Sequence, residues 1–105
     1  MYRSQICDAL GRRHLLRFRY KDHVTSTTVE PYTYGENKSG HLVLSAWLVA
    51  GETHDTKPPF WRLYREDEMQ GVEVLQDTFS KNRSGYKPND SRFGVIHCRL
   101  APPSA

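Results

Sequence analysis

Residues 15–20 read LLRFRY, and this stretch decides the fold class. Apolar and basic side chains alternate through it, with Phe18 and Tyr20 on one side and Arg17 and Arg19 on the other. A period of two is that of a β-strand with one buried face. The stretch therefore predicts a strand that packs on a core and presents two arginines to solvent.

The segment before this strand has the spacing of a short helix. Within residues 3–13, Ile6 and Leu10 lie one helical turn apart, and Ser4 could serve as the N-cap. An amphipathic helix of this length can cover one end of a sheet. We therefore expect residues 1–14 to form a helical cap.

Four later segments have the composition or the alternation of strands, and polar turns separate them. The first contains Pro31, which requires an edge position or a bulge. The second is apolar on both sides and is expected at the centre of the sheet, with the third pairing back onto it. The four segments are residues 27–34, 41–48, 60–64 and 69–75.

A helix followed by about five short strands is the pattern of a small barrel. The sequence predicts a mainly β fold, a partly open SH3-like or Sm-like barrel with an N-terminal helix. A length of 105 residues suffices for one domain and is too short for two. We divide the domain 1–105 into a helical cap (1–14), a barrel (15–75) and a basic, loop-rich tail (76–105).

The sequence has neither an apolar run long enough to cross a bilayer nor a signal-peptide core. It therefore predicts a cytoplasmic protein without a membrane partner. Thiols usually remain reduced in that compartment. We accordingly expect Cys7 and Cys98 to be reduced residues that serve in packing.

The net charge of +3 is modest, but its distribution is uneven. Basic residues gather in the first twenty positions and in the last third of the chain, and acidic residues gather between them. If the two basic segments meet in space, they form a surface for anions. The alternative is an ordinary solvated face, and charge alone leaves both open.

The order of the strand motifs resembles the WYL domain family of bacterial regulatory proteins. The resemblance covers roughly residues 5–75 and rests on four motifs in order. They are LLRFRY (15–20), VEPYTY (29–34), GHLVLSAW (40–47) and WRLYRE (61–66).

The resemblance implies an SH3-like barrel that senses a ligand, often nucleotide or nucleic acid, beside a DNA-binding helix-turn-helix. The family's name-giving Trp and Tyr are Leu42 and Val43 here, and an arginine usual before the fourth strand is Pro59. The fold therefore carries over more readily than the ligand pocket. We expect a stand-alone or excised module, because the residues before the first strand leave no room for a helix-turn-helix.

The strongest constellation for binding combines arginines with aromatic residues. Arginine grips phosphate with a planar fork and tyrosine can stack on a base. In the family, the positions that match Arg65 and Tyr32 contribute to the ligand channel. The loop 36–41, with Lys38 and His41, is a separate candidate rim. The predicted binding residues are Arg17, Arg19, Tyr32, His41, Arg62, Tyr64 and Arg65.

A structural reading of the same residues stays open. Aromatic residues in strands are more often part of a core, and the arginines can pair with the acids of residues 66–68. Likewise residues 84–90 (SGYKPND) are either a binding loop or, as we favour, an exposed connection.

The sequence contains no catalytic or phosphate-loop motif, and its histidines lack the spacing of a zinc site. We predict a binding module and not an enzyme, without cofactor or metal, that takes a nucleotide or single-stranded nucleic acid. It would act in transcriptional regulation or defence by shifting the conformations of a fused or partner DNA-binding domain.

Two other functions remain open. One is a protein-interaction or homo-oligomerisation module that uses open strand edges and exposed Trp47 and Trp61. The other, weaker one is a small nuclease with His41 or His54 as the acid or base.

Overall fold

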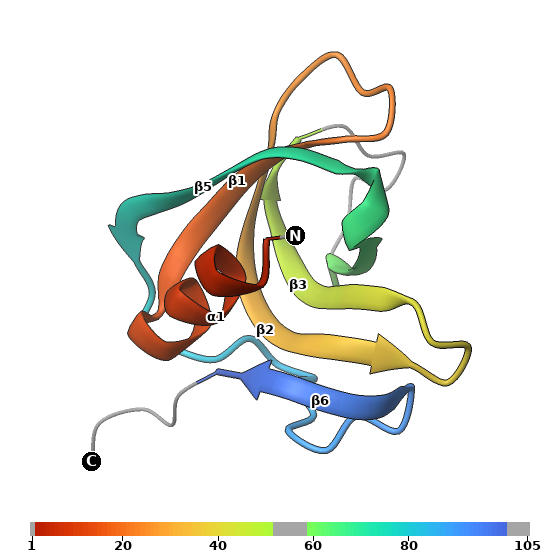
Figure 1. Ribbon diagram of the computed structural model, residues 1–105. Helices are drawn as coiled ribbons and strands as arrows, with labels where there is room; N and C mark the ends of the chain where they lie inside the picture. Colours follow the sequence, from red (N-terminus) through yellow and green to blue (C-terminus); the bar gives the residue numbers. More distant parts are fainter. Residues whose placement is uncertain (1, 52–58, 101–105) are drawn as a thin grey trace.

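The computed structural model describes residues 2–51 and 59–100, and this part of the chain is mainly β (Figure 1). One helix precedes the strands, as predicted, and a 3-10 turn interrupts them. The elements are α1 (Arg3–Arg12), β1 (His14–Tyr20), β2 (Thr27–Asn37), β3 (Leu42–Ala50), β4 (Trp61–Arg65), η1 (Glu66–Glu68), β5 (Met69–Thr78) and β6 (Phe93–Arg99).

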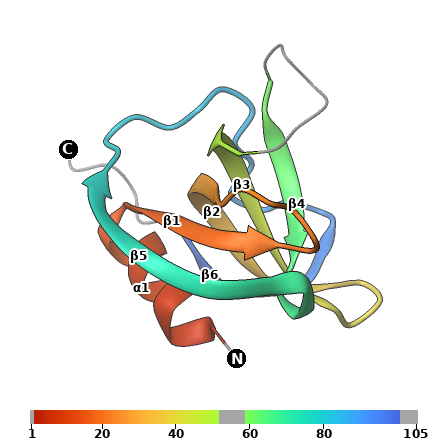
Figure 2. The ribbon, with the colours of Figure 1, turned by 90° about the horizontal axis from the view of Figure 1, so that it is seen from above.

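The strands form one antiparallel sheet in the order β4-β3-β2-β1-β5, and β6 pairs with β2. The sheet curls around the core without closing, because β4 and β5 are the two ends of this path (Figure 2). Side chains nevertheless meet across the interior. The rings of Tyr20 and Tyr64 lie 4.9 Å apart, and the Arg65 N–H donates to the Tyr20 hydroxyl at 3.0 Å.

A bulge at Pro31 reverses the alternation of β2. Pro31 pairs with Ala46, and Thr33 pairs with Ser45, so Tyr32 is the extra residue on its strand. The bulge that the proline predicted is therefore present, within a central strand. Beyond it, Tyr34 occupies the inner face of the sheet and shares that face with Leu44, its partner on β3.

Helix α1 packs its apolar side on the sheet. Ile6 and Leu10 are fully buried, as their spacing predicted. The prediction of Ser4 as the N-cap is wrong: Tyr2 holds that position without a side-chain cap, and Ser4 is an exposed residue inside the helix. The helix ends at Arg12, and the C-cap residue Arg13 has a left-handed backbone (φ 57°) whose N–H donates to the Ala9 carbonyl.

The tail contains a sixth strand that the sequence did not predict. Strand β6 pairs with the second half of β2, and its burial alternates too weakly to reveal it in one sequence. The two strands approach closely at Gly35, where an added Cβ would collide with the Val95 carbonyl and lie 2.9 Å from Ile96 Cα. Glycine at position 35 therefore permits this pairing.

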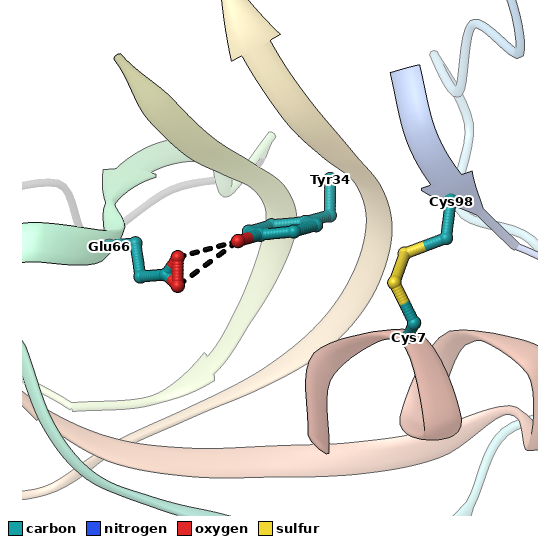
Figure 3. The surroundings of a disulfide bond; sticks show 4 residues. All are labelled: Cys7, Tyr34, Glu66 and Cys98. Atoms are coloured by element: carbon teal, nitrogen blue, oxygen red, sulfur yellow. Dashed lines mark hydrogen bonds between the residues drawn. A yellow bond between two sulfur atoms is a disulfide. The ribbon is translucent and has the colours of Figure 1, made fainter. Parts of the chain in front are cut away.

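The prediction that both cysteines are reduced is wrong, since Cys7 of α1 and Cys98 of β6 form a disulfide (Figure 3). The two residues are 91 positions apart, so their proximity follows from the packing of α1 beside β6. The bond fastens the helix to the last strand. Neither spacing nor composition reveals such a contact.

A buried carboxylate lies on the inner side of the same region. The Tyr34 hydroxyl donates to both Glu66 oxygens, at 2.5 and 3.0 Å (Figure 3). The Tyr2 N–H donates to Glu66 Oε2 at 3.0 Å. Burial opposes ionisation of Glu66, but these hydrogen bonds outweigh it and hold the pKa below its ordinary value. Glu66 is therefore part of the interior and not one of the acids that screen the predicted arginine site.

Residues 79–92, which we call the pinned tail, are held by arginines. Arg13 donates to the Phe79 and Ser80 carbonyls, Arg83 makes two 2.9 Å hydrogen bonds to buried Glu30, and Arg99 donates to the Pro88 carbonyl. The segment lacks regular structure but covers an aromatic cluster on the outer face of β2, β3 and β4. That cluster comprises Tyr32, Trp47, Trp61, Phe79 and Tyr86.

Candidate functional site

The two arginines of β1 lie in one groove on the outer face of the sheet. The strand alternates as predicted, since Phe18 and Tyr20 are buried whereas Arg17 and Arg19 are exposed. The groove has a volume of about 350 Å³. We call it the arginine groove, and it is lined by Arg17, Phe18, Arg19, Ser26, Gln70, Gly71 and Glu73.

The far wall of the groove comes from β5. Arg17 lies opposite Glu73 and Arg19 lies opposite Gln70, with a register shift between the two pairs. Gly71 adopts a left-handed backbone there (φ 63°), as glycine does at bulges of this kind. The irregularity places polar and small residues beside the guanidinium groups.

The contacts of the two guanidinium groups are weak and exposed. Arg17 Nη2 lies 3.1 Å from Glu73 Oε2, but the two side chains are 45% and 60% exposed, so water screens the pair. Arg19 Nη2 donates to the His23 carbonyl at 3.2 Å. A phosphate can replace either contact, because neither buries a charge.

Tyr64 lies in the core and not in the groove. Its side chain faces inward beside Leu44 and meets Phe18 and Tyr20 edge to face at 5.2 and 4.9 Å. Burial raises the pKa of Tyr64 well above its ordinary value. Tyr64 is therefore a core residue, as the alternative interpretation of the aromatic residues predicted.

Tyr32 is also buried, on the opposite face of the sheet. Its hydroxyl donates to Glu30 at 3.2 Å and accepts the Arg83 N–H at 2.9 Å, while its ring meets Trp61 and Tyr86. Burial raises the pKa of Tyr32 to about 12. The ring has no exposed face on which a base could stack, since its exposed fraction is 0%.

The remaining predicted residues lie elsewhere. Arg62 pairs with the core residue Ala46, and its Nη1 donates to the Trp61 carbonyl at 2.8 Å. Arg65 Nη2 lies 2.6 Å from Asp67, which raises the pKa of the guanidinium.

His41 lines a different pocket, of about 300 Å³. Two carboxylates, Glu66 and Asp67, share that lining, so the pocket disfavours anions. His54, the other residue of the nuclease hypothesis, falls outside the described residues. Of the seven predicted binding residues, the structure thus brings together Arg17 and Arg19 only.

Sequence reasoning missed the residues of the groove that come from β5. Gln70, Gly71 and Glu73 became part of the site because β5 pairs with β1 and not with its sequence neighbour β4. The opposite charges of Arg17 and Glu73 are compatible with that pairing. However, a single ion pair does not fix the register of two strands.

The interaction hypothesis expected Trp47 and Trp61 to be exposed, but both are half-buried. Their rings meet edge to face at 5.6 Å, and the Arg83 guanidinium lies 5.0 Å from the centre of the Trp47 ring. Both belong to the cluster beneath the pinned tail. Across residues 2–51 and 59–100, no three His, Cys, Asp or Glu side chains are grouped to hold a metal ion.

Comparison of the chain with protein-family models, with curated proteins and with solved structures finds no match. In the described part of the chain, no helix has the length and apolar character needed to cross a membrane. The function is therefore argued from the arrangement of side chains.

Proposed function

We propose that the chain is a binding module whose arginine groove takes phosphate groups of single-stranded nucleic acid, with a nucleotide as the smallest ligand of the same chemistry. The observation that carries this proposal is the presence of two exposed guanidinium groups in one groove, Arg17 and Arg19. Arginine forks bind phosphate oxygens in pairs, more strongly than neutral donors do.

The spacing of the two arginines supports an extended ligand. Arg17 and Arg19 are two residues apart on one strand face, which corresponds to about 6.6 Å along the strand. A single strand that runs along β1 can present successive phosphates at a comparable interval. Ser26 and Gln70 line the same groove and offer further hydrogen-bond donors.

Glu73 acts as an internal competitor in this proposal. Its carboxylate oxygen Oε2 accepts a hydrogen bond from Arg17 Nη2 at 3.1 Å, and a phosphate would have to replace this contact. The exchange of this exposed pair for a phosphate costs little, because such pairs contribute about 0.2 to 1 kcal/mol. The groove is therefore ready to bind without a change in the fold.

The resemblance to WYL domains fits this proposal and extends it. The curled sheet with its N-terminal helix is compatible with a partly open SH3-like barrel, the fold that the resemblance implies. We propose regulation of transcription or of a defence process as the context, through binding and not through turnover. A ligand in the groove would change which contacts a fused or partner DNA-binding domain can make.

The test is a fluorescence-anisotropy titration of labelled oligothymidine and oligouridine. We expect the wild-type protein to bind and Arg17→Ala/Arg19→Ala to bind at least about tenfold more weakly, because each charge-assisted hydrogen bond contributes about 1.5 to 3 kcal/mol. Glu73→Gln should bind more tightly than wild type, since it removes the competing charge at nearly constant shape.

The matched control is Arg12→Ala/Lys81→Ala, which removes the same charge from exposed positions outside the groove. It should bind within about twofold of wild type. Equal losses in the control and in the groove variant would mean that net charge, and not the groove, attracts the nucleic acid. Absence of wild-type binding at low salt would reject the proposal.

The alternative is an interaction module, and one observation favours it. Strand β4 is an edge of the sheet and carries Leu63, which is 38% exposed on the outer face. An exposed edge with an apolar side chain can pair with another chain. Salt separates the two functions, because phosphate binding weakens steeply with ionic strength and an apolar contact does not.

A further inference from the structure

A further pocket lies between the sheet and the pinned tail, on residues that the proposed function does not use. Its floor comes from β2, β3 and β4, its roof from the tail, and its volume is about 280 Å³. We call it the tail pocket. It is lined by Thr33, Ser45, Trp61, Gly85, Tyr86, Lys87, Asp90 and Arg92.

Two aromatic rings are fixed in the walls of the tail pocket. Trp61 Nε1 donates to the Ser84 carbonyl at 2.9 Å, which sets the orientation of the indole. Gly85 has a left-handed backbone (φ 95°), and an added Cβ would lie 2.9 Å from Trp61 Nε1. The Tyr86 ring packs against the Tyr32 ring at a centroid distance of 5.0 Å, and burial raises the pKa of Tyr86. The walls are thus ordered before a ligand arrives.

The cations at the pocket differ in availability. Arg92 binds the buried Asp90 carboxylate through Nε at 3.0 Å and through Nη2 at 2.6 Å, so this pair is internally neutral. Lys87 is exposed, and its charge helps to lower the pKa of Asp90. Asp90, Arg92 and Lys87 together carry one net positive charge, which exposed Lys87 can present to a ligand.

The floor offers polar groups at the bottom of the pocket. Thr33 and Ser45 lie opposite each other on β2 and β3, and both are buried. Ser45 lines the pocket with a hydroxyl that can donate to or accept from a ring substituent.

We propose that the tail pocket binds a planar aromatic molecule that carries one anionic group. The ring contacts Trp61 and Tyr86, the anion binds Lys87, and the Ser45 hydroxyl contacts the ring edge. Nucleoside monophosphates and aromatic carboxylates share this chemistry. A volume of about 280 Å³ admits one such molecule and excludes an oligonucleotide, which distinguishes this pocket from the arginine groove.

The experiment is an NMR titration of the ¹⁵N-labelled chain with the four nucleoside monophosphates, indole-3-carboxylate, benzoate, adenosine and inorganic phosphate. The indole N–H signals are assigned with Trp61→Phe. We expect at least one aromatic anion to shift the signals of Trp61, Gly85 and Lys87, with adenosine and phosphate binding at least tenfold more weakly than that anion. The class of compound that binds, nucleoside monophosphate or aromatic carboxylate, identifies the kind of ligand that the pocket takes.

Three variants decide whether the pocket is responsible. Lys87→Ala should weaken binding at least tenfold, and Gly85→Ala should abolish it by displacing the indole. Lys81→Ala, an exposed lysine of the same tail that does not line the pocket, should leave binding unchanged.

This result does not depend on nucleic-acid binding at the arginine groove, since Arg17→Ala/Arg19→Ala should bind the small molecule as the wild type does. Binding that Lys87→Ala leaves intact would overturn the assignment of the pocket. Absence of any shift at millimolar concentrations of all the aromatic anions would overturn the inference itself.

Discussion

The arginines of β1 and those that hold the pinned tail all lie in the basic segments of the chain, but their structural roles differ. Arg17 and Arg19 project into a groove and make weak, exposed contacts. Arg13, Arg83 and Arg99 reach backbone carbonyls and a buried carboxylate, and they fasten a segment without regular structure to the sheet. A basic segment can therefore serve as a structural support and not as a ligand surface.

The two groups of arginines differ in how far their carboxylate partners are shielded from water. Glu30 is 6% exposed and depends on Arg83 for its charge balance, whereas Glu73 is solvated and does not depend on Arg17. Removal of a cation from a buried carboxylate is costly, and removal from a solvated one is not. Substitutions in the two regions should therefore separate stability from binding.

The largest expected effect is the loss of the disulfide. Cys7→Ala/Cys98→Ala should lower the free energy of unfolding by about 2 to 5 kcal/mol, because the bond closes a long loop and constrains the unfolded chain. Urea denaturation of the variant and of the reduced wild type measures this. Equal stability with and without the bond would show that β6 and α1 hold together by packing alone.

Arg83→Ala should have the next largest effect, about 2 kcal/mol, which is below the range for a fully buried pair because Arg83 is half-exposed. It leaves Glu30 buried without its cation and removes the guanidinium from the Trp47 ring. Addition of Glu30→Gln to Arg83→Ala should restore part of the loss. If the double variant were no more stable than the single one, the buried charge would not be the cause.

Acid should weaken the attachment of the pinned tail at Asp90. The hydrogen bonds from Arg92 hold the pKa of Asp90 below its ordinary value of 3.8. A lowered pKa means that the pair stabilises the fold fully above about pH 4 and that this contribution disappears as the pH falls through the lowered pKa. Asp90→Asn should therefore flatten the acid side of a plot of unfolding free energy against pH, by about 0.5 to 1 kcal/mol. If the unfolding free energy of Asp90→Asn fell with decreasing pH as steeply as that of the wild type, other carboxylates, Glu66 first among them, would be the cause of the acid destabilisation.

The smallest effect on stability belongs to the groove. Arg17→Ala/Arg19→Ala should change the free energy of unfolding by less than about 1 kcal/mol, since both side chains are exposed and their contacts are weak. Thermal unfolding followed by circular dichroism checks this. A loss of several kcal/mol would mean that these arginines support the fold as Arg83 does.

The sequence was sufficient for the local elements and insufficient for their long-range pairing. The alternation of β1 and the apolar spacing of α1 were predicted, and the bulge is one of the two alternatives predicted at Pro31, because each depends on neighbours within a few residues. Strand β6 and the Cys7–Cys98 bond were not, because their partners lie far away in the chain.

The candidate site shows the same division. The exposure of Arg17 and Arg19 followed from the period of two, whereas the burial of Tyr32 and Tyr64 depended on the bulge and on the curl of the sheet. Aromatic residues in strands give the same pattern whether they line a core or a binding face.

The most direct test of the arginine groove is the salt dependence of its affinity for oligothymidine. Each phosphate bound from a single strand contributes about −0.7 to the slope of log K against log [salt]. The account predicts that Arg17→Ala/Arg19→Ala makes the slope less steep by about 1.4, and that Arg12→Ala/Lys81→Ala leaves it unchanged. An identical slope in the groove variant and the wild type would contradict the claim that these two arginines bind phosphate.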